Sequence, residues 1–268
     1  MNPTDILFPI LCIGGLGIVL GIGLGFAGKI FHVEVNPKVT EVLEALPGAN
    51  CGACGFAGCA NLAELIADGN APINACPVGG GALVEKIAAI MGAEVGKTEK
   101  RVAYVKCAGN FSDAVYRYDY YGIADCRAVS MLAGGGSKQC AYGCIGSGSC
   151  VRACQYDALS IADGVAVVDP EKCVACGLCL PKCPRGLLEM VPYDSNVRVA
   201  CNSRDPGKVV RANCKVGCIA CKLCEKACGY DAIHLENNLS RIDYSKCTMC
   251  GDCVKKCPMK TIKIIDEG

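Results

Sequence analysis

The chain has 268 residues, of which 25 are cysteine, two are histidine and none is tryptophan. In a short secreted chain a cysteine share of about 9 % would indicate a disulfide scaffold, but a chain of this length does not need such stapling. The formal net charge of +1 provides no global field for nucleic acid or an anionic surface. Two histidines also exclude any site that needs several imidazoles.

The chain opens with an apolar stretch. Residues Ile6–Ile30 carry one charge, Lys29, and as a helix would be ~37 Å long, enough to cross ~30 Å of hydrocarbon. A signal peptide is the alternative, but residues 1–5 contain no Lys or Arg. We therefore expect a single-pass anchor over residues 1–30. The basic residues that follow the apolar core are Lys29, His32 and Lys38. The positive-inside rule then places the main body in the cytoplasm, at the cell (inner) membrane.

Glycines recur along the expected anchor. Gly17, Gly21 and Gly25 are spaced four residues apart and share one helix face, which favours close approach of a partner helix. The alternative is a flexible anchor without a partner. Cys12 stands alone in this stretch and is interpreted as a small hydrophobic residue.

The first cysteine group follows a short helical pattern over residues 37–48. It reads C-x2-C-x4-C-x16-C-P and consists of Cys51, Cys54, Cys59 and Cys76. A helical pattern over residues 60–69 separates the third cysteine from the fourth. Three thiolates on a glycine-rich loop at a helix start suit an anionic inorganic cluster. We expect a four-cysteine iron–sulfur domain over residues 31–90.

Four further cysteine runs form two tandem modules, expected over residues 136–192 and 214–268. The first run has spacings x3, x5 and x3, and the other three have x2, x2 and x3. The cysteines of the first module are Cys140, Cys144, Cys150, Cys154, Cys173, Cys176, Cys179 and Cys183. Those of the second module are Cys218, Cys221, Cys224, Cys228, Cys247, Cys250, Cys253 and Cys257.

The spacing of these runs is typical of two-cluster ferredoxins, in which the fourth cysteine of each run binds the other cluster. Crossed ligation then predicts four ligand sets. They are Cys140, Cys144, Cys150 with Cys183; Cys173, Cys176, Cys179 with Cys154; Cys218, Cys221, Cys224 with Cys257; and Cys247, Cys250, Cys253 with Cys228. Zinc sites more often use two separated C-x2-C pairs, and disulfides do not suit a cytoplasmic body.

Four cysteines lie outside these groups. Cys107 and Cys126 belong to a connecting segment over residues 91–135, and Cys201 and Cys214 flank an inter-module segment over residues 193–213. The sequences V-R-V-A-C and V-V-R-A-N-C around the latter pair suggest short strands. The four thiols could form a sixth cluster, remain buried free thiols or form two bridges.

The order of these features resembles the B subunit of the Rnf ion-translocating electron transport complex. The resemblance rests on G-A-N-C-G-A-C-G-F-A-G-C, K-Q-C-A-Y-G-C-I-G-S-G-S-C and K-C-V-A-C-G-L-C-L-P-K-C-P, and it covers essentially the whole chain. The Cys51–Cys76 group also resembles the iron–sulfur domain of corrinoid proteins. The family resemblance implies electron transfer between soluble ferredoxin and NAD, coupled to Na+ or H+ transport. It also implies that flavin and NAD belong to other, integral and peripheral, subunits.

From the residues alone we expect a small, irregular α+β fold that acts as an anchored electron carrier. It would hold five [4Fe–4S] clusters, or six if the four remaining cysteines also bind one. No G-x-G-x-x-G opens a helix, there is no Walker A sequence and no nucleophile triad appears, so the chain itself has no catalytic residues. The rival functions are a relay subunit of a hydrogenase or a heterodisulfide reductase-like complex, and a metal-storage or scaffold protein.

Overall fold

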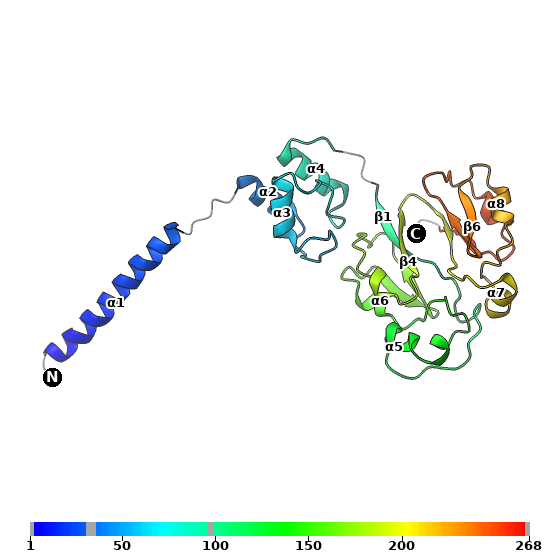
Figure 1. Ribbon diagram of the computed structural model, residues 1–268, viewed down its shortest axis with the longest axis horizontal. Coiled ribbons are helices and arrows are strands. Elements are labelled where there is room, and N and C mark those ends of the chain that lie inside the picture. Colours follow the sequence, from blue (N-terminus) through cyan, green and yellow to red (C-terminus); the bar gives the residue numbers. More distant parts are fainter. Residues whose placement is uncertain (1–2, 31–35, 96–98, 266–268) are drawn as a thin grey trace.

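The computed structural model describes residues 3–30, 36–95 and 99–265 (Figure 1). Helix α1 runs over Pro3–Ile30, with its side chains described from Gly14 onward. Cys12 and His32 therefore fall outside the described side chains. The glycine face expected to meet a partner helix is exposed, with no atom within 4 Å of a Cβ added at Gly17, Gly21 or Gly25.

No helix in the described part of the chain combines the length and the hydropathy that a membrane span requires.

Three helices form the small domain expected around the first cysteine group. They are α2 (Pro37–Ala45), α3 (Cys59–Ala67) and α4 (Gly80–Met91). Their apolar faces meet in a core that includes Val42, Leu62 and Ile66, each at most 1 % exposed. On α2 the expected face is only partly right, because Leu43 is 37 % exposed.

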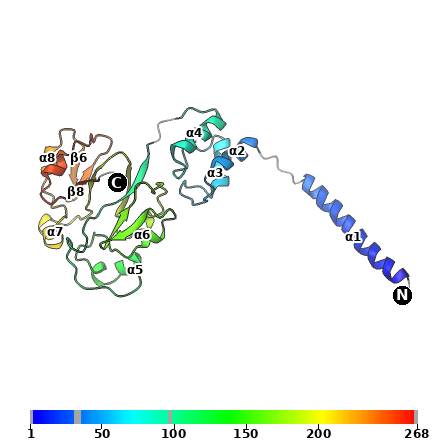
Figure 2. The same cartoon turned by 180° about the vertical axis from the view of Figure 1, so that it is seen from behind.

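Four antiparallel strand pairs build the rest of the chain, in two units that repeat the same topology. In the first unit β1 (Arg101–Val105) pairs with β4 (Leu188–Pro192), and β2 (Leu159–Ala162) pairs with β3 (Val165–Val168). In the second unit β5 (Val197–Val199) pairs with β8 (Ile262–Ile264), and β6 (Ile233–Glu236) pairs with β7 (Leu239–Ile242). The two units lie side by side in Figures 1 and 2.

Each repeat is longer than its cysteine runs suggest. The first strand of each unit, β1 or β5, lies upstream of the cysteines, within segments expected only to connect modules. Its partner is the last strand of the unit, so pairing brings the two ends of the repeat together. The pseudo-symmetry therefore includes the stretches that carry Cys107 and Cys201.

The short helices lie at the cysteine runs. They are α5 (Cys126–Ser130), α6 (Ser149–Arg152), α7 (Gly207–Asn213), α8 (Leu223–Ala227), α9 (Asp252–Lys256) and the 3-10 turns Ala133–Gly135 and Leu180–Lys182. One of them corrects an expectation: V-V-R-A-N-C is helix α7 rather than a strand. Pro206 precedes the helix and accepts hydrogen bonds from the backbone N–H groups of Val209 and Val210. V-R-V-A-C does contain strand β5, as expected.

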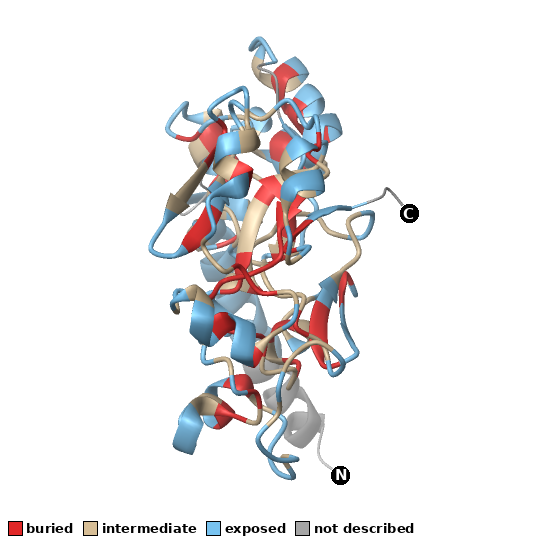
Figure 3. Ribbon diagram, turned by 90° about the vertical axis from the view of Figure 1, so that its right-hand side faces the viewer, coloured by how far each residue is buried: buried red, intermediate tan, exposed pale blue. Residues whose placement is uncertain are grey.

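Cysteines belong to the core of both repeats. Cys144, Cys150 and Cys179 pack with Val105, Leu159 and Leu187 in the first repeat. In the second repeat Cys201, Cys218 and Cys224 pack with Val199, Ile233 and Ile262. Figure 3 shows buried residues along the strands and on the inward sides of the helices. The interior is thus built around thiols, in keeping with five phenylalanines and no tryptophan.

Candidate iron–sulfur sites

The first cysteine group lies on the loop that leads into α3. Gly52, Gly55 and Gly58 have positive φ values of 70°, 84° and 147°, which turn the backbone sharply between the cysteines. Asn50 closes the loop, because its side-chain oxygen accepts a hydrogen bond from Cys59 N–H at 2.8 Å. Burial raises the pKa of Cys76, and the neighbouring Cys54 and Cys59 raise it further.

Three cavities in the repeats are each lined by four cysteines. The sets are Cys154, Cys173, Cys176 and Cys179; Cys218, Cys221, Cys224 and Cys257; and Cys228, Cys247, Cys250 and Cys253. These are the sets that crossed ligation predicts, with the fourth thiol brought from the neighbouring run. Four thiols around a closed space are the donor set of a [4Fe–4S] cluster, so the residues fit that group.

The loops around these cavities share one backbone pattern. The second and fourth residues after the first cysteine have positive φ in every regular run, including Ala220 at 57° and Lys222 at 61°. The other pairs are Ala175 and Gly177, and Met249 and Gly251. Such alternation curls the loop into a concave nest of backbone N–H groups, which suits an anionic cluster.

Backbone amides also donate to the fourth cysteine of three runs. The sulfurs of Cys183, Cys228 and Cys257 accept hydrogen bonds from the N–H of the residue four positions later, at 3.3 to 3.4 Å. In each of these runs the third residue after that cysteine has positive φ. Hydrogen bonds to thiolate sulfur favour the charged ligand form and tune the potential of a bound cluster.

Burial makes the thiols poor acids while no metal is bound. Desolvation is the largest cause of a pKa raised to about 11 at Cys150 and Cys253, and to about 12 at Cys179 and Cys201. Positive charge near the sulfurs is needed to hold four thiolates together, and iron would supply it.

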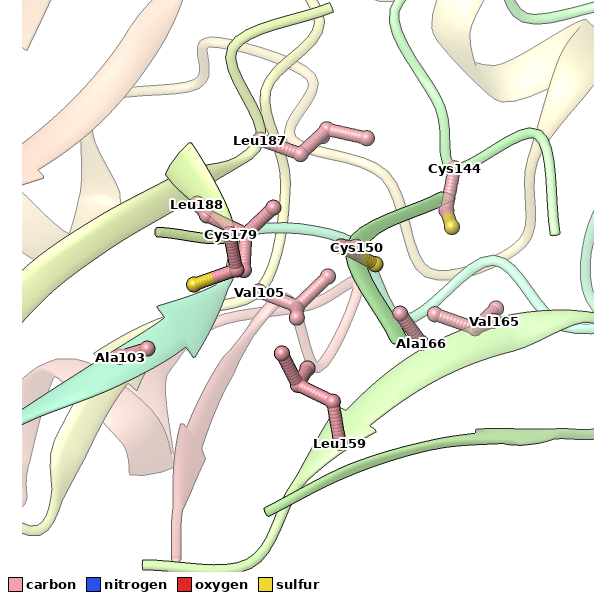
Figure 4. Packing of buried hydrophobic residues seen from close by; sticks show 10 residues of the cluster. All are labelled: Ala103, Val105, Cys144, Cys150, Leu159, Val165, Ala166, Cys179, Leu187 and Leu188. Atoms are coloured by element: carbon pink, nitrogen blue, oxygen red, sulfur yellow. The ribbon is translucent and has the colours of Figure 1, made fainter. Parts of the chain in front are cut away.

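The first run of the first module departs from the expected ligand set. Cys140 lines a different cavity, together with Cys107, Cys201 and Cys214. Cys150 instead has Cys144, Cys126 and Cys183 as its interacting thiols. Figure 4 shows the sulfurs of Cys144 and Cys150 on one side of the core and that of Cys179 pointing to the other.

Cys126 is held beside Cys150 by a short network. The backbone N–H of Cys126 donates to Ser149 Oγ at 2.8 Å, and that hydroxyl donates to Asp125 at 2.9 Å. Arg152 completes the network through its contact with Asp125 at 3.7 Å. Cys126 therefore does not join the other three unassigned cysteines, with which the sequence grouped it as a possible sixth cluster.

A signal in the sequence could have found this partition. Aligned residue by residue with C-V-A-C-G-L-C, the first run reads C-I-G-S-G-S-C from Cys144, with Ser147 at the second cysteine position. Gly146 and Gly148 have the positive φ of the equivalent residues in the regular runs, at 85° and 75°. Counting gaps from Cys140 hid this register.

Two alternatives to clusters can be compared with the structure. All cysteines with described side chains are free thiols. Within the same part of the chain no group of three or more Cys, His, Asp or Glu side chains converges on a single metal ion. A [4Fe–4S] cluster differs in that four cysteines hold four irons together.

A larger cavity lies apart from the cysteine groups. It has a volume of about 480 Å³ and is bounded by residues of β1, β3, β5 and β8. Its lining is mainly apolar and includes one cysteine, Cys107, so we assign no cluster to it.

Tyr156 lies between the helical domain and the first repeat. Its phenol interacts with Cys51 and Cys76 on one side and with Cys154 and Cys176 on the other. Burial, and then these thiols, raise the pKa of Tyr156. The first cysteine group is therefore next to the outer cysteine group of the first module.

The geometry defines an iron–sulfur protein with ferredoxin-like two-cluster domains, and family models agree. Residues 143–187 and 217–261 match the family "4Fe-4S dicluster domain", and residues 46–78 match "Putative Fe-S cluster". The dicluster match begins next to Cys144 and leaves out Cys140.

Curated relatives cover nearly the whole chain, and each is the B subunit of a membrane oxidoreductase complex. The chain is 49 % identical, over 96 % of its own length and 77 % of the relative's, to that of the "Na(+)-translocating ferredoxin:NAD(+) oxidoreductase complex" of Acetobacterium woodii. It is 46 % identical, over 95 % and 97 %, to that of the "Ion-translocating oxidoreductase complex" of Methanosarcina acetivorans. It is 41 % identical, over 100 % and 95 %, to that of the "Proton-translocating ferredoxin:NAD(+) oxidoreductase complex" of Clostridium ljungdahlii. The chain belongs to this family, the B subunits of the Rnf-type ion-translocating oxidoreductase complexes.

Proposed function

We propose that this chain is the iron–sulfur subunit that receives electrons from reduced ferredoxin in an ion-translocating ferredoxin:NAD oxidoreductase complex. The observation that carries the proposal is the grouping of thiols in fours along the molecule, in a chain of this family. Bound [4Fe–4S] clusters supply one-electron transfer. The sequence has no dinucleotide-binding motif, so other subunits would bind flavin and NAD and transport Na+ or H+.

Five clusters are the minimum that this proposal requires. Four are assigned to the Cys51–Cys76 group and to the three cavities lined by four cysteines. The fifth would use Cys144, Cys150 and Cys183 with one further thiolate. The chain's own contribution is to hold the thiolates in place, to direct backbone N–H groups at the sulfurs and to exclude water from most of them.

The second module is the better place for ferredoxin to dock. Its Cys221 and Cys250 are exposed, whereas no cysteine of the first module is. Exposed lysines surround them: Lys222, Lys226, Lys246, Lys255, Lys256 and Lys260. A positive patch beside accessible ligands favours an acidic electron carrier and short transfer distances.

Inside-out membrane vesicles that contain the whole complex test this function. We expect reduced ferredoxin to drive NAD reduction, and Cys54→Ala to abolish NADH formation while ferredoxin still bleaches the remaining iron–sulfur absorbance. Cys12→Ala is the control and should leave both signals unchanged. Undiminished NADH formation by the Cys54→Ala complex, or purified chain that holds zinc without acid-labile sulfide, would contradict the proposal.

We also propose that residues 1–30 anchor the chain in the membrane, with the remainder on the cytoplasmic side. The support is an apolar stretch with one charge, Lys29, and basic residues only after it. A chain lacking residues 1–30 should be brown and soluble, and should wash off the same vesicles at high salt. If it stays with the integral subunits at full occupancy, this segment is not the main tether.

A further inference from the structure

We infer that Cys107, Cys140, Cys201 and Cys214 bind a sixth [4Fe–4S] cluster at the junction of the two repeats, with two ligands from each. The inference rests on the proposed function in that the chain must be a cluster protein. It goes beyond that function by assigning a site that combines the two modules, and by moving Cys140 out of the first module.

Cys140 is available because the first run does not use it. In the register fixed by Gly146 and Gly148, the run begins at Cys144 and Ser147 occupies the second ligand position. Cys126, held next to Cys150, supplies the missing thiol from another segment. The cluster of that run therefore has four thiols without Cys140.

The four cysteines of the junction occupy equivalent positions in the two repeats. Cys107 and Cys201 each lie two residues after the first strand of their unit, β1 or β5. Cys140 and Cys214 each lie four residues before the first cysteine of their module, in the matching sequences C-A-Y-G-C and C-K-V-G-C. Each repeat thus contributes the same two thiols, and the cavity that they line lies on the pseudo-symmetry relation between the repeats.

The backbone hydrogen bonds are equivalent as well. Cys144 N–H donates to Cys107 Sγ at 3.3 Å, and Cys218 N–H donates to Cys201 Sγ in the second repeat. Cys201 also accepts from Ser203 N–H at 3.4 Å. These donors are the first cysteines of the two modules, so the junction is directly connected to the neighbouring cluster of each.

The backbone comes close to the sulfurs at two glycines. A Cβ at Gly109 would lie 3.3 Å from Cys214 Sγ and 3.8 Å from Cys107 Sγ. A Cβ at Gly143 would lie 3.6 Å from Cys140 Sγ and 3.7 Å from Cys107 Sγ. The three sulfurs therefore face a common region from which side chains are missing. Cys201 completes it from the 8 % exposed core position after β5.

A buried cation independently indicates an anion at this place. Lys138 is 2 % exposed, lines the cavity and donates to Gly164 O at 2.9 Å, and it forms no salt bridge among the described residues. Its interacting thiols are Cys107, Cys144 and Cys140. A buried ammonium without an anionic partner is costly, and thiolates of a bound cluster would provide that partner. Arg185, half-buried, adds a second cation by donating to Cys140 O at 3.2 Å.

Cluster iron in paired cysteine variants tests the assignment on the full chain purified anaerobically. Wild type should hold about 24 iron and about 24 sulfide per chain, and Cys201→Ala about 20 of each. The double variant Cys140→Ala/Cys201→Ala should lose no more than Cys201→Ala, because both changes remove one cluster. Cys126→Ala/Cys201→Ala should lose two clusters, falling to about 16 iron. Cys12→Ala is the control.

The outcomes separate the inference from the proposed function. Unchanged iron in Cys201→Ala, or two clusters lost in Cys140→Ala/Cys201→Ala, would overturn the sixth site as assigned. If these variants do not accumulate, the wild-type count decides, since about 20 iron and sulfide contradicts the inference and leaves the function standing. Zinc without sulfide in the wild type would overturn the proposed function itself.

Discussion

Ser147→Cys should restore the cluster that Cys126→Ala removes. Cys126→Ala deletes one of the four thiols around Cys150, and iron should fall by about four per chain. Ser147 occupies the position of Cys176 in the equivalent run, on a loop whose flanking glycines have the same positive φ. A cysteine placed there should complete the site from its own loop, and the double variant should return to the wild-type iron and sulfide content.

The matched control is Ser149→Cys in the Cys126→Ala background. Ser149 lies two residues further on, beside the same ligand loop, but at a position that carries no ligand in the regular runs. It should leave the iron deficit in place. Rescue by both serine changes, or by neither, would contradict the register on which the ligand assignment depends.

Lys138→Met should lower the reduction potential of the clusters nearest to it. The ammonium of Lys138 is buried near Cys107, Cys140 and Cys144, where solvent screens it poorly. Loss of about 1–2 kcal/mol of charge interaction corresponds to a shift on the order of 50–100 mV towards more negative potential. Redox titration followed by EPR on the purified chain would measure it.

Lys172→Met is the control for this prediction. Lys172 immediately precedes Cys173, but its side chain is 61 % exposed and contacts Asp169 at 3.4 Å. The same change there should shift the potentials little, because water and salt screen an exposed charge. Equal shifts in the two variants would show that burial of Lys138 at the junction has no special effect.

Local spacing in the sequence is enough to predict most of the candidate sites. Three of the four crossed sets surround a common cavity, because a triple-cysteine loop and a fourth cysteine four residues later impose one geometry wherever they occur. The helices around the first group are predictable for a similar reason, since Val42, Leu62 and Ile66 recur at helical spacing. The ligand assignments themselves remain predictions.

The partition of the other cysteines depends on contacts that spacing does not encode. Cys107 reaches Cys201 only because β1 and β5 are the first strands of two repeats packed together. Cys126 is directed to Cys150 by hydrogen bonds with Ser149, across an intervening segment of the chain. Segment V-V-R-A-N-C fails differently: its β-branched residues favour a strand, whereas Pro206 begins a helix.

The most direct measurement is a high-resolution map of the cluster-loaded complex, with iron located by its own scattering. The account predicts six separate cubane densities in this chain, including one bound by Cys107, Cys140, Cys201 and Cys214, and one bound by Cys126, Cys144, Cys150 and Cys183. A map with Cys140 bonded to the same cluster as Cys150, or with no iron at the junction of the two repeats, would contradict it.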